Sequence, residues 1–154
     1  MLVLFICTGN TCRSPMCEGY LKHLCKQASR NDITVESAGT FAGEGCPASI
    51  NSAEIMADYD IDICSHTSST LSEEKIEKAN IIIAMTASHR AQIGAMYPKA
   101  LKKTRLLMEF ADMENSDVED PFGGDAQTYS SCFEQMKPAL DNLFLDIDKF
   151  KKSN

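Results

Sequence analysis

Residues 2–15, LVLFICTGNTCRSP, decide the fold because they join a buried strand to a helix through a short loop. Residues 2–6 are apolar without alternation, which is typical of a strand covered on both faces in a parallel sheet. The run stops at residues 8–10 (TGN). Ser14 and Pro15 then form a helix-start signal, with serine as the N-cap and proline at the first helical position. The segment therefore predicts a strand, a loop and a helix in succession.

The rest of the chain alternates strands with helices in the same manner. Alternation of apolar and polar residues predicts a strand nearer the sheet edge at residues 33–37, and an apolar run predicts a second buried strand at 81–85, with a shorter strand candidate at 105–108. Helices are predicted over about 48–59 and 87–96. A long amphipathic helix follows, although Pro138 lies within it, and its apolar residues are Phe133, Met136, Leu140, Leu143, Phe144 and Ile147. We therefore expect a doubly wound α/β structure with right-handed crossovers, in which ligands bind beyond the carboxyl ends of the strands.

The composition is that of one acidic globular domain. The chain has 154 residues, so we expect a single domain over residues 1–154 whose core needs no disulfide framework or structural metal. The net charge of −7 disfavours nonspecific binding to nucleic acid or to an anionic membrane. The first apolar run has no basic residues before it and is too short to span a bilayer. Seven cysteines without a secretory leader favour a reducing compartment, and we expect a cytoplasmic protein.

The loop after the first strand combines the features of a phosphate-binding site. A loop that wraps into a helix N-terminus turns backbone N–H groups toward one point, and its residues are Thr8, Gly9, Asn10, Thr11, Cys12, Arg13 and Ser14. Gly9 and Asn10 tolerate the positive φ that such a loop needs. Arg13 can bind two oxygens of a tetrahedral oxyanion. The same N–H groups and the helix dipole are expected to lower the pKa of Cys7, which gives a thiolate near neutral pH. The Ser14 hydroxyl can donate to that thiolate.

Cys7 is the candidate nucleophile of this loop. A lone cysteine at the end of a strand is more often a small buried residue. Here five residues separate Cys7 from Arg13, and a Ser-Pro helix start follows. This combination favours covalent catalysis through a phosphocysteine. The segment is not a nucleotide-binding P-loop, because it lacks the Gly-Lys-Ser/Thr ending.

Residues 7–18, CTGNTCRSPMCE, closely resemble the signature of the low-molecular-weight protein tyrosine phosphatase family. The resemblance covers most of the chain and continues at residues 37–40 (SAGT), 82–85 (IIAM) and 120–124 (DPFGG). One departure is Cys17, where the family usually has alanine, and we expect this side chain only to pack. The resemblance implies a three-layer α/β/α, flavodoxin-like fold with a mainly four-stranded parallel sheet. It also implies a phosphatase of phosphorylated proteins that uses neither a metal nor a cofactor.

The resemblance assigns roles outside the loop as well. Asp120 corresponds to the general acid, which protonates the leaving group and then activates the water that hydrolyses phosphocysteine. Asn10, Ser37 and His66 correspond to side chains that brace the loop. The family often has an arginine a few residues after this histidine, and residues 68–70 (SST) contain none. Cys12 corresponds to the partner of the nucleophile in a reversible disulfide; it can equally face the interior, and both can hold.

Thr11, Phe41 and Phe122 are the candidate lining of the substrate pocket. The two phenylalanines can stack on a flat substrate group, and for Phe41 packing under a loop is an equal alternative. Tyrosine-directed members often have an aliphatic residue at the position of Thr11 and two tyrosines after Asp-Pro. Thr11 together with residues 120–124 resembles the bacterial protein arginine phosphatases, since a threonine hydroxyl can accept from a guanidinium N–H. We rank phosphotyrosine first as the substrate and phosphoarginine as a close alternative.

Other classes share parts of this pattern. Arsenate reductases have the same loop but need further redox cysteines near the third strand, and residues 81–90 contain none. A phosphocysteine carrier has no use for Arg13 together with Asp120. A phosphopeptide-binding module without activity is expected to lack Cys7 or Asp120, and both are present. We expect a monomer, because no apolar stripe remains unassigned. Four further cysteines have no zinc-site spacing and are expected to be buried or partly buried thiols: Cys25, Cys46, Cys64 and Cys132.

Overall fold

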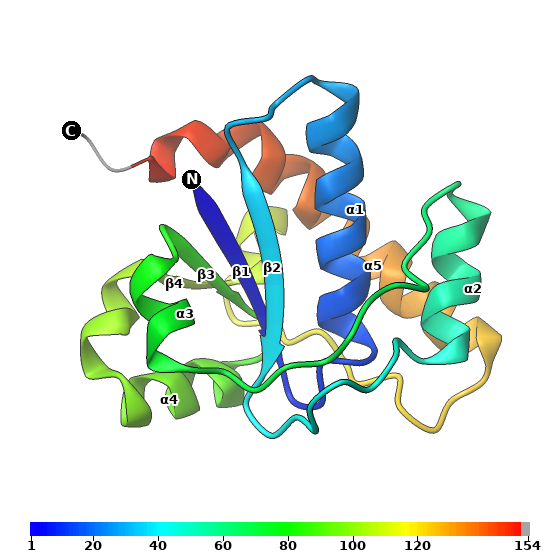
Figure 1. Ribbon diagram of the computed structural model, residues 1–154, viewed down its shortest axis with the longest axis horizontal. Helices are drawn as coiled ribbons and strands as arrows, with labels where there is room; N and C mark the ends of the chain where they lie inside the picture. Colours follow the sequence, from blue (N-terminus) through cyan, green and yellow to red (C-terminus); the bar gives the residue numbers. More distant parts are fainter. Residues whose placement is uncertain (152–154) are drawn as a thin grey trace.

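A central parallel sheet organises the protein in a computed structural model that describes residues 1–151. The strands are β1 (Leu2–Cys7), β2 (Thr34–Gly39), β3 (Ile81–Ala84) and β4 (Thr104–Leu106). They form a four-stranded sheet in the order β2-β1-β3-β4, and every adjacent pair is parallel. The predicted α/β fold is therefore confirmed (Figure 1). Residues 152–154 of the predicted domain lie outside the described residues.

Helices cover both faces of this sheet (Figure 1). One face carries α1 (Arg13–Gln27), α2 (Ile50–Asp58) and α5 (Ala126–Asp146), and the other carries α3 (Glu73–Lys78) and α4 (Ala87–Met96). Alternate residues of β1 point to the two faces. Val3 and Phe5 pack with the first group of helices, and Leu4 and Ile6 pack with the second. Because all four side chains are fully buried, β1 is apolar without alternation.

The predicted elements are found with shifted ends, and one helix was missed. The helix predicted at 87–96 coincides with α4. The strand predicted at 105–108 ends at Leu106, because the 3₁₀ helix η2 (Leu107–Ala111) begins at the next residue. The short helix α3 has the sequence EEKIEK, in which only Ile76 is apolar, so it carries no periodic signal. The final helix α5 continues through Pro138. Two further 3₁₀ helices are η1 (Pro98–Lys103) and η3 (Ile147–Phe150).

The carboxyl ends of the three strands β1, β2 and β3 meet at one edge of the sheet. Cys7 is level with Gly39 of β2, and Ile6 is level with Ala84 of β3. The loop after β1, the loop after β2 and the start of α4 therefore lie beside one another at the edge where ligands bind in such folds.

None of the helices in residues 1–151 is long and apolar enough to cross a membrane.

Candidate active site

The loop between β1 and α1 wraps around the sulfur of Cys7. Asn10 has a φ of 56°, whereas Gly9 does not adopt a positive φ, so only one of the two predicted positions uses the left-handed region. The helix begins at Arg13, and its N-cap residue is Cys12. The prediction of Ser14 as the N-cap is therefore wrong. The predicted contact of its hydroxyl with Cys7 is confirmed, because Ser14 Oγ lies 2.8 Å from Cys7 Sγ.

Asn10 is the internal brace of this loop, and its side chain is completely buried. Its Nδ2 donates to Ser14 Oγ and to Ser37 Oγ, at 2.9 Å in each case. Its Oδ1 accepts from the backbone N–H of Ser69 at 2.9 Å, and its carbonyl oxygen lies 2.8 Å from His66 Nε2. Because Ser14 Oγ accepts from Asn10, the hydroxyl proton of Ser14 is left to donate to Cys7 Sγ. The structure thus brings the predicted supporting residues together.

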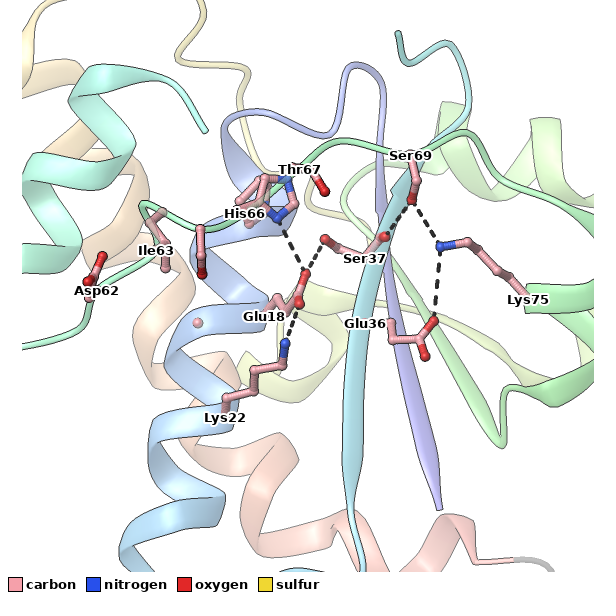
Figure 2. A pocket seen from close by; sticks show the side chains of 13 residues that line it. Glu18, Lys22, Glu36, Ser37, Asp62, Ile63, His66, Thr67, Ser69 and Lys75 are labelled. Carbon is pink, nitrogen blue, oxygen red and sulfur yellow. Dashed lines mark hydrogen bonds and ion pairs between the residues drawn. The ribbon is translucent and has the colours of Figure 1, made fainter. Parts of the chain in front are cut away.

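Glu18 extends this brace, and sequence reasoning missed it. Its carboxylate accepts from Ser37 Oγ and lies 3.8 Å from His66 Nδ1, and its other oxygen is paired with Lys22 at 2.5 Å. Figure 2 shows these side chains converging from α1, β2 and the segment after α2, on the wall of a pocket behind the phosphate loop. Because Ser37 and His66 come from other elements than Glu18, no spacing along the sequence indicates its role in the brace.

Arg13 joins the loop to the segment that carries Asp120. The guanidinium is buried; it donates to the carbonyl oxygen of Val118 at 2.9 Å and lies 3.5 Å from Asp120 Oδ2. Asp120 is half-exposed, and its Oδ1 accepts from the backbone N–H of Phe122 at 3.1 Å. A cavity of about 210 Å³ is lined by Cys7, Thr8, Gly9, Asn10, Thr11, Cys12, Arg13, Asp120 and Phe122. The predicted nucleophile, phosphate-binding residues and acid therefore face one space.

The two candidate aromatic walls differ in position. Phe122 lines the cavity with its ring 78% exposed. Phe41 is 87% exposed and does not line the cavity, so packing of its ring under a loop is wrong. Its backbone N–H donates to the carbonyl oxygen of Thr8 at 3.0 Å, which holds Phe41 next to the phosphate loop. Phe122 is thus a wall of the cavity, and Phe41 is an exposed side chain beside it.

The predicted ionisation of Cys7 is wrong. Burial raises the pKa of the Cys7 thiol, and the hydrogen bonds from Ser14 and the positive charge of Arg13 only partly offset this effect. The loop sequence predicts those favourable contacts but does not show that Sγ is almost completely buried. A thiol proton must therefore leave Cys7 when it acts as a nucleophile.

The other cysteines fall into two groups. Cys12 is buried, with its Sγ 3.2 Å from the hydroxyl of Tyr129. Its side chain therefore faces the interior, which was one of the two interpretations of this residue. Burial together with this hydrogen bond raises the pKa of Tyr129 to about 12. Cys46 and Cys64 are exposed, which corrects the prediction for these two; both lie in loops. Within residues 1–151, no cluster of three or more His, Cys, Asp or Glu side chains could hold a metal ion.

Gly39 allows the loop after β2 to approach the phosphate loop, and we expect Gly39→Ala to reduce kcat/KM by about tenfold or more. A β-carbon at this position would lie 2.3 Å from the carbonyl oxygen of Thr8, so the backbone beside Cys7 must move. Gly43→Ala, in the same loop, meets only the sulfur of Cys46 at 3.4 Å and serves as the control. Steady-state kinetics with p-nitrophenyl phosphate test this prediction, which equal activities of the two variants would contradict.

His89 is a second residue that sequence reasoning missed. It lies in the first turn of α4 and is 4% exposed. Its Nε2 lies 2.8 Å from Thr8 Oγ1, and its Nδ1 lies 2.9 Å from Thr86 Oγ1. Burial, aided by the positive charge of Arg13, lowers the pKa of His89 to about 4. The side chain is therefore neutral at pH 7 and hydrogen-bonded at both nitrogens.

We expect His89 to make the protein less stable as the pH falls below about 6.5. An unfolded chain binds a proton on histidine near pH 6.5, whereas the native side chain stays neutral down to about pH 4. The contribution of neutral His89 to the free energy of unfolding is fully present above pH 6.5 and declines as the pH falls toward 4. At about pH 5 the free energy of unfolding has fallen by about 2 kcal/mol. Urea unfolding at about pH 7.5 and about pH 5 should show this loss in wild type and not in His89→Gln. The same pH dependence in both proteins would be evidence against it.

Comparisons of the sequence with known proteins all find phosphatases. A family model described as low molecular weight phosphotyrosine protein phosphatase matches residues 2–153. The chain is 38% identical over 141 residues to a protein-arginine-phosphatase of Geobacillus stearothermophilus, covering 92% of each protein. It is 34% identical over 143 residues to the low molecular weight protein-tyrosine-phosphatase PtpB of Staphylococcus haemolyticus, covering 93% of this chain and 97% of the relative.

A solved structure is similar over almost the whole chain. It is that of YwlE arginine phosphatase, in which the active-site residue is a substituted serine that carries a phosphoryl group. The TM-score is 0.92 at 32% identity, and the match covers 99% of each chain. The likeness thus includes the loop, the sheet edge and the helices described above.

Proposed function

The chain belongs to the low-molecular-weight protein tyrosine phosphatase family, and from this membership we propose that it removes the phosphoryl group from phosphoarginine in proteins. The observation that carries this proposal is Thr11, a small hydroxyl-bearing residue on the wall of the cavity. Its hydroxyl can accept from a guanidinium N–H, whereas an aliphatic side chain would leave that donor without a partner. The likeness to relatives named arginine phosphatases supports the same substrate.

Phosphotyrosine is the second candidate substrate, and one observation favours it. The ring of Phe122 is exposed on the wall of the cavity, where it can stack on a phenol ring. A planar guanidinium can occupy the same wall, because its face also packs on aromatic rings. Phe122 is therefore compatible with both substrates, and the side chain of Thr11 distinguishes them.

The first chemical step in this proposal forms a phosphocysteine. Arg13 and the backbone N–H groups of the loop bind the oxygens of the phosphoryl group, whose dianion accepts the proton of the Cys7 thiol. The Cys7 sulfur then attacks phosphorus, and the P–N bond to the guanidinium group breaks. Asp120 gives its proton to the departing nitrogen, so arginine leaves as a guanidinium cation and not as a strongly basic neutral guanidine. The role of Asp120 is supported by its distance of 3.5 Å to Arg13 and by its half-exposed side chain on the wall of the cavity.

The second step returns the enzyme to its starting form. Asp120, now a carboxylate, accepts a proton from a water molecule that attacks phosphorus. The P–S bond breaks, and the sulfur is released as a thiolate that the hydroxyl of Ser14 stabilises at 2.8 Å. The thiolate then takes its proton back from the dihydrogen phosphate, which leaves as the dianion. Asn10, Ser37 and His66 hold the loop in one shape during both steps, because their hydrogen bonds satisfy its buried polar groups. The positive charge that stabilises the bound phosphoryl group comes from Arg13 and the loop N–H groups.

The setting of this reaction is part of the same proposal. The substrates are phosphorylated proteins, which follow from the family. We propose a cytoplasmic monomer that binds neither nucleic acid nor membranes, in keeping with the net charge of −7. A reversible Cys7–Cys12 disulfide is also proposed, since the two thiols line one cavity and Cys12 is within a short loop of the nucleophile.

A comparison of two phosphopeptides tests the proposed substrate. We expect a higher kcat/KM for a phosphoarginine peptide than for a phosphotyrosine peptide of matched sequence. Thr11→Ile should lower this ratio by about tenfold or more, because it removes the hydroxyl and crowds the polar group. Thr11→Ser, which retains the hydroxyl, is the control. A ratio that Thr11→Ile leaves unchanged, or a wild-type preference for phosphotyrosine, would refute the assignment.

A further inference from the structure

His89 and Thr8 connect α4 to the phosphate loop through side chains alone. Thr8 follows the nucleophile directly and lines the cavity, whereas His89 lies 81 residues further along the chain and is buried beneath it. The contact between His89 Nε2 and Thr8 Oγ1, at 2.8 Å, spans the adjacent ends of β1 and β3. Neither residue takes part in the brace formed by Asn10, Ser37 and His66.

The hydrogen bonds around His89 favour the tautomer with the proton on Nε2. Thr86 Oγ1 already accepts from the backbone N–H of His89 at 3.1 Å, as the N-cap of α4. Its own hydroxyl proton is satisfied if it donates to His89 Nδ1 at 2.9 Å. In the neutral imidazole the remaining proton then resides on Nε2, which donates to Thr8 Oγ1. Every hydrogen of the Thr86–His89 pair has a partner in this arrangement.

This arrangement fixes how Thr8 can act. Its Oγ1 accepts from His89, so its own hydroxyl proton remains available to a group in the cavity. Its carbonyl oxygen accepts from the N–H of Phe41 at 3.0 Å, so the residue is held from the backbone side as well. The cavity is where Arg13 and the loop bind the phosphoryl group in the proposed function. A hydroxyl held in this way is a preorganised donor, because it needs no reorientation when the substrate binds.

We propose that His89 is a positioning residue of the phosphatase reaction, which holds the Thr8 hydroxyl as a donor to the bound phosphoryl group. This inference rests on the proposed function, since it assigns the same site a further donor. It also assigns α4 a role in the reaction, through the one side chain that reaches the loop from that helix. The donor is needed most when negative charge shifts among the phosphoryl oxygens, so its loss should lower kcat more than it raises KM.

A double-mutant cycle tests the proposal. Thr8→Val removes the hydroxyl, and His89→Leu removes the group that holds it. We expect each variant to lower kcat for p-nitrophenyl phosphate by about tenfold with little change in KM, and the double variant to be no worse than either. His89→Gln, whose amide N–H can replace Nε2–H, should recover most of the activity. Ser88→Ala, in the same turn of α4, is the control and should match wild type.

Several outcomes would overturn the assignment. Effects of Thr8→Val and His89→Leu that multiply in the double variant would show that the two residues act independently. A normal kcat in Thr8→Val would show that the Thr8 hydroxyl is not used. Thr8 is exposed, so this substitution is expected to leave the fold intact. His89→Gln as impaired as His89→Leu would also count against it. If wild type hydrolyses neither p-nitrophenyl phosphate nor a phosphopeptide, the proposed function fails; if wild type is active and the cycle is additive, only the His89 assignment fails.

Discussion

Cys7→Ser is expected to lower turnover of every phosphorylated substrate by about 10⁴-fold or more while the site still binds phosphate. A serine hydroxyl ionises far less readily than a thiol and forms a poor leaving group in the second step, so a phosphoserine would not be hydrolysed at a useful rate. Arg13 and the loop N–H groups are unchanged by the substitution. Binding of inorganic phosphate should therefore remain within a few-fold of wild type.

The control for this prediction is another cysteine of the same chain. Cys64 is exposed and remote in sequence from the loop, so Cys64→Ser should retain full activity. Steady-state kinetics give the turnover, and calorimetric titration with phosphate gives the binding. Residual activity of Cys7→Ser within about tenfold of wild type would exclude a phosphocysteine mechanism. Loss of phosphate binding together with turnover would show that the substitution disrupts the loop.

Asp120→Asn is expected to have the second largest effect, and its size should depend on the leaving group. A guanidine nitrogen leaves as a strong base unless it is protonated, so we expect turnover of a phosphoarginine peptide to fall by about 10³-fold. p-Nitrophenolate is a stable anion, so its release needs less help. With p-nitrophenyl phosphate the second step becomes limiting, and phosphoenzyme should accumulate.

Glu119→Gln provides the matched control, because it removes a carboxylate from the neighbouring exposed position. Of these two carboxylates, that of Asp120 is the one paired with Arg13, at 3.5 Å, so Glu119→Gln should leave turnover of both substrates near wild type. The measurement is kcat for the two substrates, with rapid quenching to detect phosphoenzyme. An equal and small effect of Asp120→Asn on both would contradict its role as the acid.

Local features of the site could be predicted from the sequence, because they lie in one contiguous segment. A loop of fixed length between Cys7 and Arg13 brings its residues around one point whatever the rest of the chain does. The resemblance then added Asp120, which composition could not distinguish from its acidic neighbours. All of these residues line the same cavity.

Features that depend on distant segments could not be predicted. Glu18 and His89 act on the loop through partners that come from other elements, and nothing in their spacing shows this. The pKa of Cys7 was predicted in the wrong direction, because burial is a property of the folded chain. The N-cap of the helix was also assigned to Ser14 and is Cys12, because the sequence does not show at which residue the first helical turn begins.

The transfer of a phosphoryl group from arginine to Cys7 is the most direct test of the account. A phosphoarginine peptide is mixed with wild-type enzyme, the reaction is quenched in base within its first turnover, and the digested protein is analysed by mass spectrometry. We predict a phosphoryl group on the peptide that contains Cys7, absent in Cys7→Ala treated alike and absent when the phosphate is omitted from the peptide. Release of phosphate from the phosphoarginine peptide by wild type with no phosphoryl group on Cys7 at any time would contradict the account.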